Sequence, residues 1–236
     1  MEEVELIPVE GHTALGRDPL SNAILNTDTT QYEAYIKARD AARKKERSLK
    51  ELQEEVATSA GAGEIVPIVL DQNDDDAVTR FVDNLTASEQ KIDLLVNSAY
   101  AGLIALAPHC GKPFWERPIS VFDASVMIGL RSSFVISSLI APVMVQQKSG
   151  LMVQISSFGG VQYLFDIGYG VSKAGLDRLT TDMAAELKPH GVHAITLYPG
   201  GAVSEVTAFP QGETTTFAGR SVEALLNKAS EAELAR

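Results

Sequence analysis

The chain has 236 residues, which gives room for one large α/β domain with a sizeable core, and its 45% hydrophobic and 22% charged residues are ordinary values for a globular protein. Its net charge of −11 argues against nucleic acid or an anionic membrane surface as a main partner. The one cysteine, Cys110, leaves no partner for an intramolecular disulfide and fits a reducing compartment.

The first part of the chain carries weak secondary-structure patterns. A short strand is predicted for residues 4–9, and residues 41–57 combine many charges with apolar residues at helical spacing, which predicts a solvated helix. The acidic N-terminus has no signal-peptide profile, and no apolar run reaches the 18 residues that indicate a membrane-spanning helix. We therefore expect a cytoplasmic protein without a transmembrane segment.

From residue 64 onward, short apolar strands alternate regularly with long helices. This alternation predicts βαβ units and a doubly wound parallel sheet, a Rossmann-like fold with three αβα layers. We expect one domain over residues 1–236, divergent over 1–40 and incomplete at its first and last strands, because the chain stops where the last strand is due. The predicted strands are 65–70, 92–96, 151–156 and 192–198, and the predicted helices are 74–86, 121–147, 169–188 and a last one from about 221.

A tyrosine and a lysine, Tyr169 and Lys173, are the strongest chemical signal in the chain. In a helix, residues four apart lie on one face, so the phenol and the ammonium can meet. The ammonium stabilises a phenolate, which favours proton transfer near neutral pH. The serine pair Ser156-Ser157 ends the strand just before this helix, and one of its hydroxyls can hold a carbonyl or alcohol oxygen. The trio is suited to moving a proton at that oxygen while a hydride moves elsewhere.

Other polar residues follow the predicted strands. In parallel sheets, ligands bind beyond the carboxyl ends of the strands, where Asp71, Asn97 and Pro199-Gly200 fall. Structural alternatives stay open for each, since Asn97 could cap or turn the chain, Asp71 could be a helix N-cap, and Pro-Gly ends many strands. The histidines have no metal-ligand spacing, so no metal site is predicted.

Over residues 65–220, these features resemble the short-chain dehydrogenase/reductase family. The element Asn97-Ser98-Ala99-Tyr100-Ala101-Gly102 is similar to the family's Asn-Asn-Ala-Gly, with an insertion. The resemblance implies that Tyr169 is the catalytic acid/base and that Lys173 assists it and binds the nicotinamide ribose. It also implies a serine that orients the substrate oxygen. The commonest family spacing selects Ser156, but the second serine of such a strand end favours Ser157, which we prefer.

The same resemblance implies a nicotinamide dinucleotide as cofactor and a mobile substrate lid over residues 205–217. A cation at Arg39, where an acidic residue would select NAD, favours NADP, with NAD as the alternative. The implied substrate is a small lipophilic carbonyl or alcohol, and the implied assembly is a homodimer through helices 121–147 and 169–188. The implied cofactor-binding residues are Gly11, Arg39, Asp71, Asn97, Ala99, Tyr169, Lys173, Pro199, Gly200 and Ser204.

Two departures from the family pattern keep a second hypothesis open. Leu15 and Arg17 stand where the family's phosphate-binding turn has glycines, and Gly129 replaces an asparagine of the long helix. The first hypothesis is an NADP-dependent carbonyl reductase or alcohol dehydrogenase. The second is a catalytically impaired scaffold or interaction protein without a working dinucleotide turn. A third is a mispredicted or alternatively spliced product of an active gene.

Overall fold

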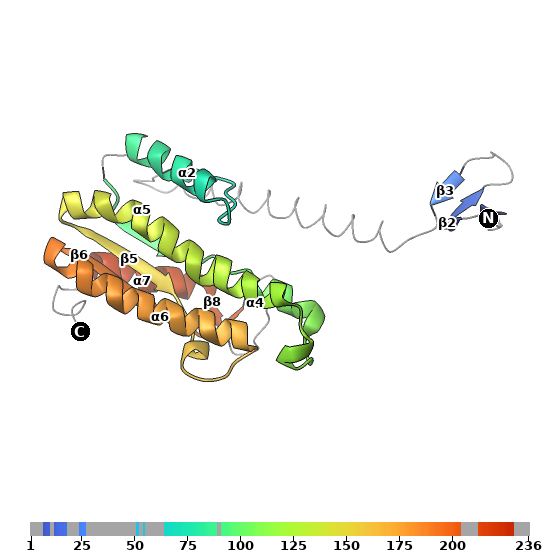
Figure 1. Ribbon diagram of the computed structural model, residues 1–236. Helices are drawn as coiled ribbons and strands as arrows, with labels where there is room; N and C mark the ends of the chain where they lie inside the picture. The colour runs from blue at the N-terminus through green and yellow to red at the C-terminus, as the bar shows by residue number, and fades with distance from the viewer. Residues whose placement is uncertain are drawn as a thin grey trace. The chain divides into compact units, whose positions relative to one another are not determined.

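The computed structural model describes residues 51, 54, 64–88, 91–203 and 212–228, together with the backbone of three short N-terminal strands (Figure 1). Its internal contacts separate two units, residues 1–69 and 70–236. The single domain expected over the whole chain stays a prediction.

In the first unit, three strands form an antiparallel sheet in the segment where the family pattern has its phosphate-binding turn. The strands β1 (Ile7–Val9), β2 (His12–Arg17) and β3 (Ile24–Asn26) lie in the order β1-β2-β3. A phosphate turn leads directly into a helix N-terminus, which supplies free N–H groups. The backbone of residues 12–17 instead pairs with strands on both sides, in keeping with the departures from the family pattern at Leu15 and Arg17.

The strand predicted for residues 65–70 is wrong. These residues form no regular structure, and the side chains of Val66, Ile68 and Val69 are exposed. Apolar sequence alone does not make a strand, because each strand needs a neighbour that accepts and donates its backbone hydrogen bonds.

The sheet of the second unit is parallel, as predicted. Its strands β4 (Leu94–Asn97), β5 (Gly150–Ile155) and β6 (Val192–Leu197) lie in the order β4-β5-β6. The register sets Asn97 at the end of β4 opposite Gln154 of β5. The carboxyl ends of all three strands therefore meet at one edge, which carries the candidate site. Two short strands, β7 (Ala202–Val203) and β8 (Glu213–Thr214), pair separately.

The predicted helices of this unit are confirmed, with changes at their ends. The long helix expected at 121–147 is a succession of α4 (Ile119–Val126), the π-helical turn η3 (Met127–Arg131) and α5 (Ser132–Gln147). The last helix, α7 (Thr215–Lys228), begins before residue 221 and takes in the end of the expected lid. The other helices are α2 (Asp75–Ser88), α3 (Gly102–Leu106) and α6 (Ile167–Leu187).

The stretch from Ile119 to Gln147 is long and apolar enough to cross a membrane, with a mean hydropathy of 1.7 in its best window. The sequence patterns had led us to expect no such segment. Within this unit, α5 packs on α2 and β5, as the core helix of a layered fold does. Length and composition alone do not separate such a helix from a membrane span.

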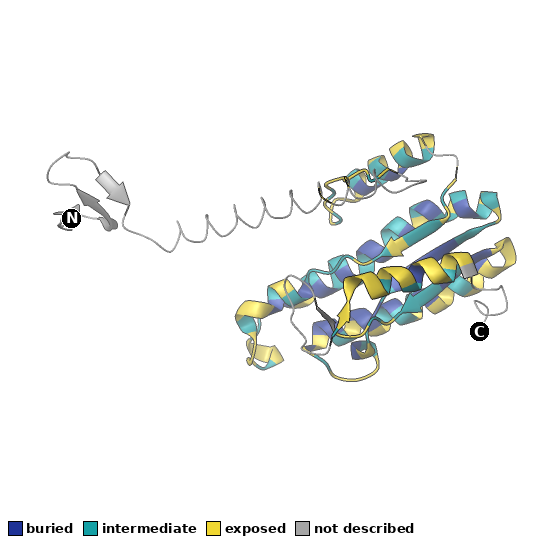
Figure 2. Cartoon of the chain, turned by 180° about the vertical axis from the view of Figure 1, so that it is seen from behind, coloured by how far each residue is buried: buried dark blue, intermediate teal, exposed yellow. Residues whose placement is uncertain are grey.

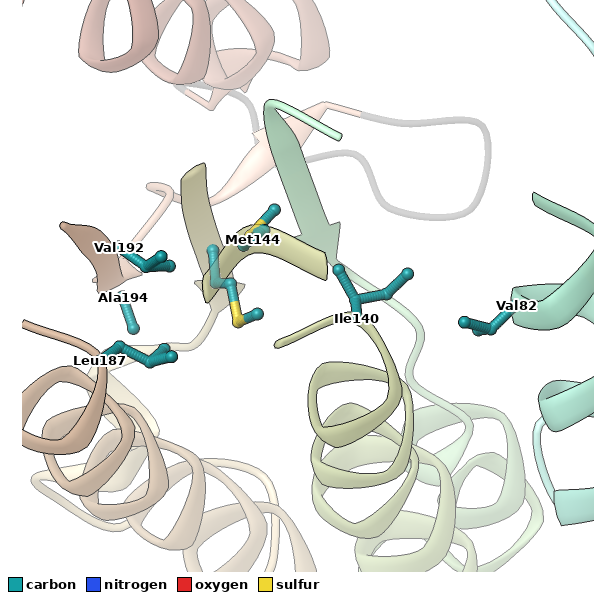
Figure 3. Close-up of a cluster of buried hydrophobic side chains, with 7 residues drawn as sticks. Val82, Ile140, Met144, Leu187, Val192 and Ala194 are labelled. Atoms are coloured by element: carbon teal, nitrogen blue, oxygen red, sulfur yellow. The ribbon is translucent and has the colours of Figure 1, made fainter. Parts of the chain in front are cut away.

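The side chains of β5 alternate between two hydrophobic clusters and so define three layers. Met152 belongs to the cluster that also contains side chains of α2, α5 and α6, of which Val82, Ile140 and Leu187 are labelled in Figure 3. Leu151 and Val153 instead pack with Val222 of α7. The outer surface of α7 is exposed (Figure 2). The larger cluster consists of Val82, Ile140, Met144, Met152, Leu187, Val192 and Ala194.

Candidate active site

Tyr169 and Lys173 lie together at the carboxyl end of the sheet, on the first turns of α6. Asp166 caps this helix, because its Oδ1 accepts a hydrogen bond of 2.7 Å from the backbone N–H of Tyr169. The Lys173 Nζ lies 5.8 Å from the centre of the Tyr169 ring. Both side chains are buried, with 8% of Tyr169 and 7% of Lys173 exposed. The structure thus brings together the two residues that helical spacing had paired.

The ammonium of Lys173 is held by the end of strand β5. Its Nζ donates a hydrogen bond of 2.9 Å to the carbonyl oxygen of Ile155, the last residue of the strand. Burial lowers the pKa of Lys173 to about 8, and the nearby carboxylate of Asp177 acts in the opposite direction. Lys173 therefore changes its charge close to physiological pH.

This lowered pKa predicts how stability depends on pH. The unfolded chain binds more protons than the folded one between the folded pKa of about 8 and the unfolded value of 10.5, so Lys173 makes stability rise with pH across this window. Below pH 8 the buried cation costs stability. We expect Lys173→Met to raise the free energy of unfolding at pH 7 by about 1–3 kcal/mol and to flatten its rise up to pH 10.5.

Urea unfolding at a series of pH values measures both effects. The matched control is Lys188→Met, which alters an exposed lysine and is expected to keep the wild-type slope. A slope in Lys173→Met equal to that of the wild type would contradict the assignment.

The hydroxyls of Ser156 and Ser157 make different hydrogen bonds. Ser156 is buried, and its Oγ donates to the carbonyl oxygen of Lys173 at 3.3 Å. Ser157 is only partly buried, and its Oγ accepts the N–H of Gly159 at 3.2 Å, so its own proton stays available for another acceptor. A Cβ at Gly159 would come within 2.4 Å of the Tyr169 ring, so glycine allows this segment to pack against the tyrosine.

Tyr100 belongs to the same cluster, and our interpretation of the sequence missed it. The centre of its ring lies 4.9 Å from Nζ of Lys173 and 5.4 Å from the centre of the Tyr169 ring, edge to face. Its hydroxyl donates to Oγ of Ser125 at 2.9 Å. A Cβ at Gly129 would approach the ring to 2.7 Å. Two features of the sequence could have indicated its role: the tyrosine inserted into the element after Asn97, and Gly129 at the position where the family has an asparagine.

Asn97 and Gly200 also lie at this edge of the sheet, but their polar groups have protein partners. Nδ2 of Asn97 donates to Oγ of Ser137 at 3.0 Å, which fastens the end of β4 to α5. The N–H of Gly200 donates to Oε2 of Glu213 at 3.2 Å. Ala99 lies in the loop after β4, and Pro199 in the segment after β6. Any contact of these residues with a cofactor stays a prediction.

Asp71 forms a turn ahead of α2. Its Oδ1 accepts the N–H of Asn73 at 2.9 Å, while Oδ1 of Asp74 accepts the N–H of Ala77 at 2.9 Å. Asp74 is therefore the cap of the helix, and the N-cap alternative for Asp71 is wrong. The remaining predicted cofactor residues, Gly11, Arg39 and Ser204, lie outside the described residues.

Comparison with known proteins places this arrangement in a family. The model of the family described as short chain dehydrogenase matches residues 30–212. The chain belongs to this family. The match begins well before residue 65, where the resemblance expected from the sequence started, and it includes Tyr169 and Lys173.

Among curated short chain dehydrogenases, the chain is similar to dehydrogenase/reductase SDR family member 1. It is 36% identical to the human protein over 184 residues, which are 69% of this chain and 59% of that protein. It is 39% identical to the mouse protein over 145 residues, which are 61% of this chain and 46% of that protein. The chain thus spans about half of the length of these relatives.

A solved structure of a metagenomic short-chain oxidoreductase in complex with NADP has a similar fold. Its TM-score is 0.62 at 25% identity, and the match covers 78% of this chain and 77% of that one. Carbonyl reductase (NADPH) 2 of Sus scrofa is 31% identical over 137 residues, which are 57% of this chain and 52% of that protein.

Proposed function

We propose that this chain catalyses reversible hydride transfer between NADP(H) and a carbonyl or secondary alcohol. The observation that carries the proposal is the buried pair of Tyr169 and Lys173 at the carboxyl edge of the sheet, with the ammonium tied to the last carbonyl of β5. Tyr169 gives a proton to the substrate oxygen during reduction and removes it during oxidation. Ser157 orients that oxygen by donating its free hydroxyl proton.

The nicotinamide end of the cofactor fits the described residues. Among them, Nζ of Lys173 has one hydrogen-bond acceptor, the Ile155 oxygen, so its other N–H groups can hold ribose hydroxyls. Pro199 and Gly200 lie beside the same edge, and their backbone would lie along the carboxamide group of the nicotinamide. The bound cofactor supplies or accepts the hydride at the carbonyl carbon. NADP rather than NAD is supported by Arg39 and by the NADP in the metagenomic relative.

A lipophilic substrate is supported by the side chains around Tyr169. The Phe165 ring lies 5.0 Å from the Tyr169 ring, and Phe158, Val161 and Phe165 all remain exposed on the segment that leads into α6. Such apolar surface favours an apolar ligand.

A homodimer is supported by the exposed apolar surface of the helices from α4 to α6. Large apolar side chains are exposed along these helices, and a second copy of the chain would cover them. They include Phe122, Phe134 and Val171.

A cytoplasmic location is supported by the single cysteine.

The antiparallel strand β2 favours a second candidate function, a scaffold or interaction protein that does not bind a dinucleotide. Residues 12–17 do not form the turn that would hold the phosphates. The two candidates differ in whether the chain binds a cofactor at all.

Thermal unfolding with NADPH or NADH tests both candidates. A ligand at about 100 times its dissociation constant stabilises the native state by about 2.7 kcal/mol, so we expect a clear rise in melting temperature with NADPH and a smaller one with NADH. Nicotinamide mononucleotide and ADP serve as partial-ligand controls. No rise with either dinucleotide at millimolar concentration would rule out the enzyme and favour the scaffold, and a preference for NADH would overturn the role of Arg39.

A further inference from the structure

We propose that Tyr100 is a positioning residue of the site, whose ring holds the ammonium of Lys173 in its charged form beside Tyr169. Its meaning for catalysis rests on the function proposed above. The interaction itself exists without cofactor or substrate and can be measured in their absence.

The position of the Tyr100 ring is fixed from several sides. Its hydroxyl donates to Ser125, whose Oγ in turn donates to the carbonyl oxygen of Val121 at 3.3 Å. Gly102 and Gly129 make the room, since a Cβ on Gly102 would meet the Tyr100 hydroxyl at 2.3 Å and one on Gly129 would meet the ring at 2.7 Å. A larger residue at either position would displace the ring.

The ring is placed to act on a cation. The negative face of an aromatic ring attracts an ammonium within about 6 Å of its centre, most strongly where water is excluded. Nζ of Lys173 lies 4.9 Å from the Tyr100 ring and 5.8 Å from the Tyr169 ring, so Tyr100 is the nearer of the two. Because Lys173 is buried, little water competes with this contact.

Tyr100 does not serve as a second acid. Burial raises its pKa to about 12, so it stays a neutral phenol over the working pH range. In the described part of the chain, Tyr169 contacts Lys173 and Asp177 of the same helix acts on its charge. The carboxylate of Asp166 acts on Tyr100 and is paired with Arg117 at 3.5 Å. The Tyr198 hydroxyl donates a hydrogen bond to the carboxylate of Asp177, so this carboxylate interacts with Tyr198 as well as with Lys173.

The test is the titration of Lys173 in the protein without nucleotide or substrate. The ε-carbon resonance of ¹³C-labelled lysine is followed against pH and assigned with Lys173→Met. Tyr100→Phe keeps the ring and removes the hydroxyl, and replacement of Tyr100 by mono-, di- and pentafluorinated phenylalanine keeps the shape while weakening the ring's negative face step by step. Tyr100→Leu removes the ring altogether.

We expect the titration midpoint of Lys173 to fall progressively along the fluorinated series, by about one pH unit in total, and to fall in Tyr100→Leu. Tyr100→Phe keeps a midpoint near that of the wild type. Tyr163→Leu, a change at an exposed tyrosine, leaves it unaltered. Equal midpoints across the fluorinated series, or a rise, overturn the proposal even where Tyr100→Leu fails to fold. If the midpoints shift as expected but the protein shows no turnover, the proposed function is contradicted while the role of the Tyr100 ring stands.

Discussion

Tyr169→Phe reduces turnover of an aldehyde and ketone panel by about 100-fold or more and leaves the affinity for NADPH nearly unchanged. The substitution removes only the hydroxyl that exchanges a proton with the substrate oxygen. The ring stays, and so do its edge-to-face contacts, in which its centre lies 5.4 Å from the centre of the Tyr100 ring and 5.0 Å from that of the Phe165 ring. Initial rates and a nucleotide titration on the same preparation separate the loss of chemistry from a loss of binding.

Tyr163→Phe is the matched control, because it removes the same hydroxyl from an exposed tyrosine. We expect wild-type turnover from it. If Tyr169→Phe kept its turnover, the acid/base role assigned to Tyr169 would be refuted, whatever the cofactor titration showed.

Ile140→Ala destabilises the second unit by about 2–5 kcal/mol, because it removes buried methyl and methylene groups and leaves a cavity. Ile140 is 2% exposed and lies between α2 and the sheet, in the cluster of Figure 3. The shift of the urea unfolding midpoint, at unchanged slope, measures the loss.

Ile104→Ala removes the same atoms from a side chain that is 77% exposed, and we expect a change within about 0.5 kcal/mol. Equal losses in the two variants would show that Ile140 does not lie in the core of the folded unit in solution.

Local sequence pattern was sufficient for the main strands and long helices of the second unit. The alternation of apolar strands and helices predicted β4, β5 and β6 and the helices between them, because each element there has the hydrophobic period of its own geometry. The same reasoning paired Tyr169 with Lys173, since four residues make about one helical turn. Both residues of the pair come from one helix, so no tertiary information was needed to place them together.

The segments that the local pattern did not predict depend on how they pair with other segments. Residues 65–70 have the composition of a strand but form no regular structure, and residues 12–17 have two antiparallel neighbours that no local period reveals. Likewise, nothing local distinguished Ser156 from Ser157. The difference arises because the Ser156 hydroxyl meets the Lys173 carbonyl across the interface between β5 and α6.

Sequence alone was enough to predict a parallel α/β unit and a tyrosine-lysine pair suited to proton transfer at a carbonyl or alcohol oxygen. Tertiary packing alone decided that Tyr100 joins the pair and that the Lys173 ammonium is tied to the end of β5, with its pKa lowered to about 8. The physical reason is that charge and burial depend on neighbours from several elements, whereas helical and strand periods are properties of one segment.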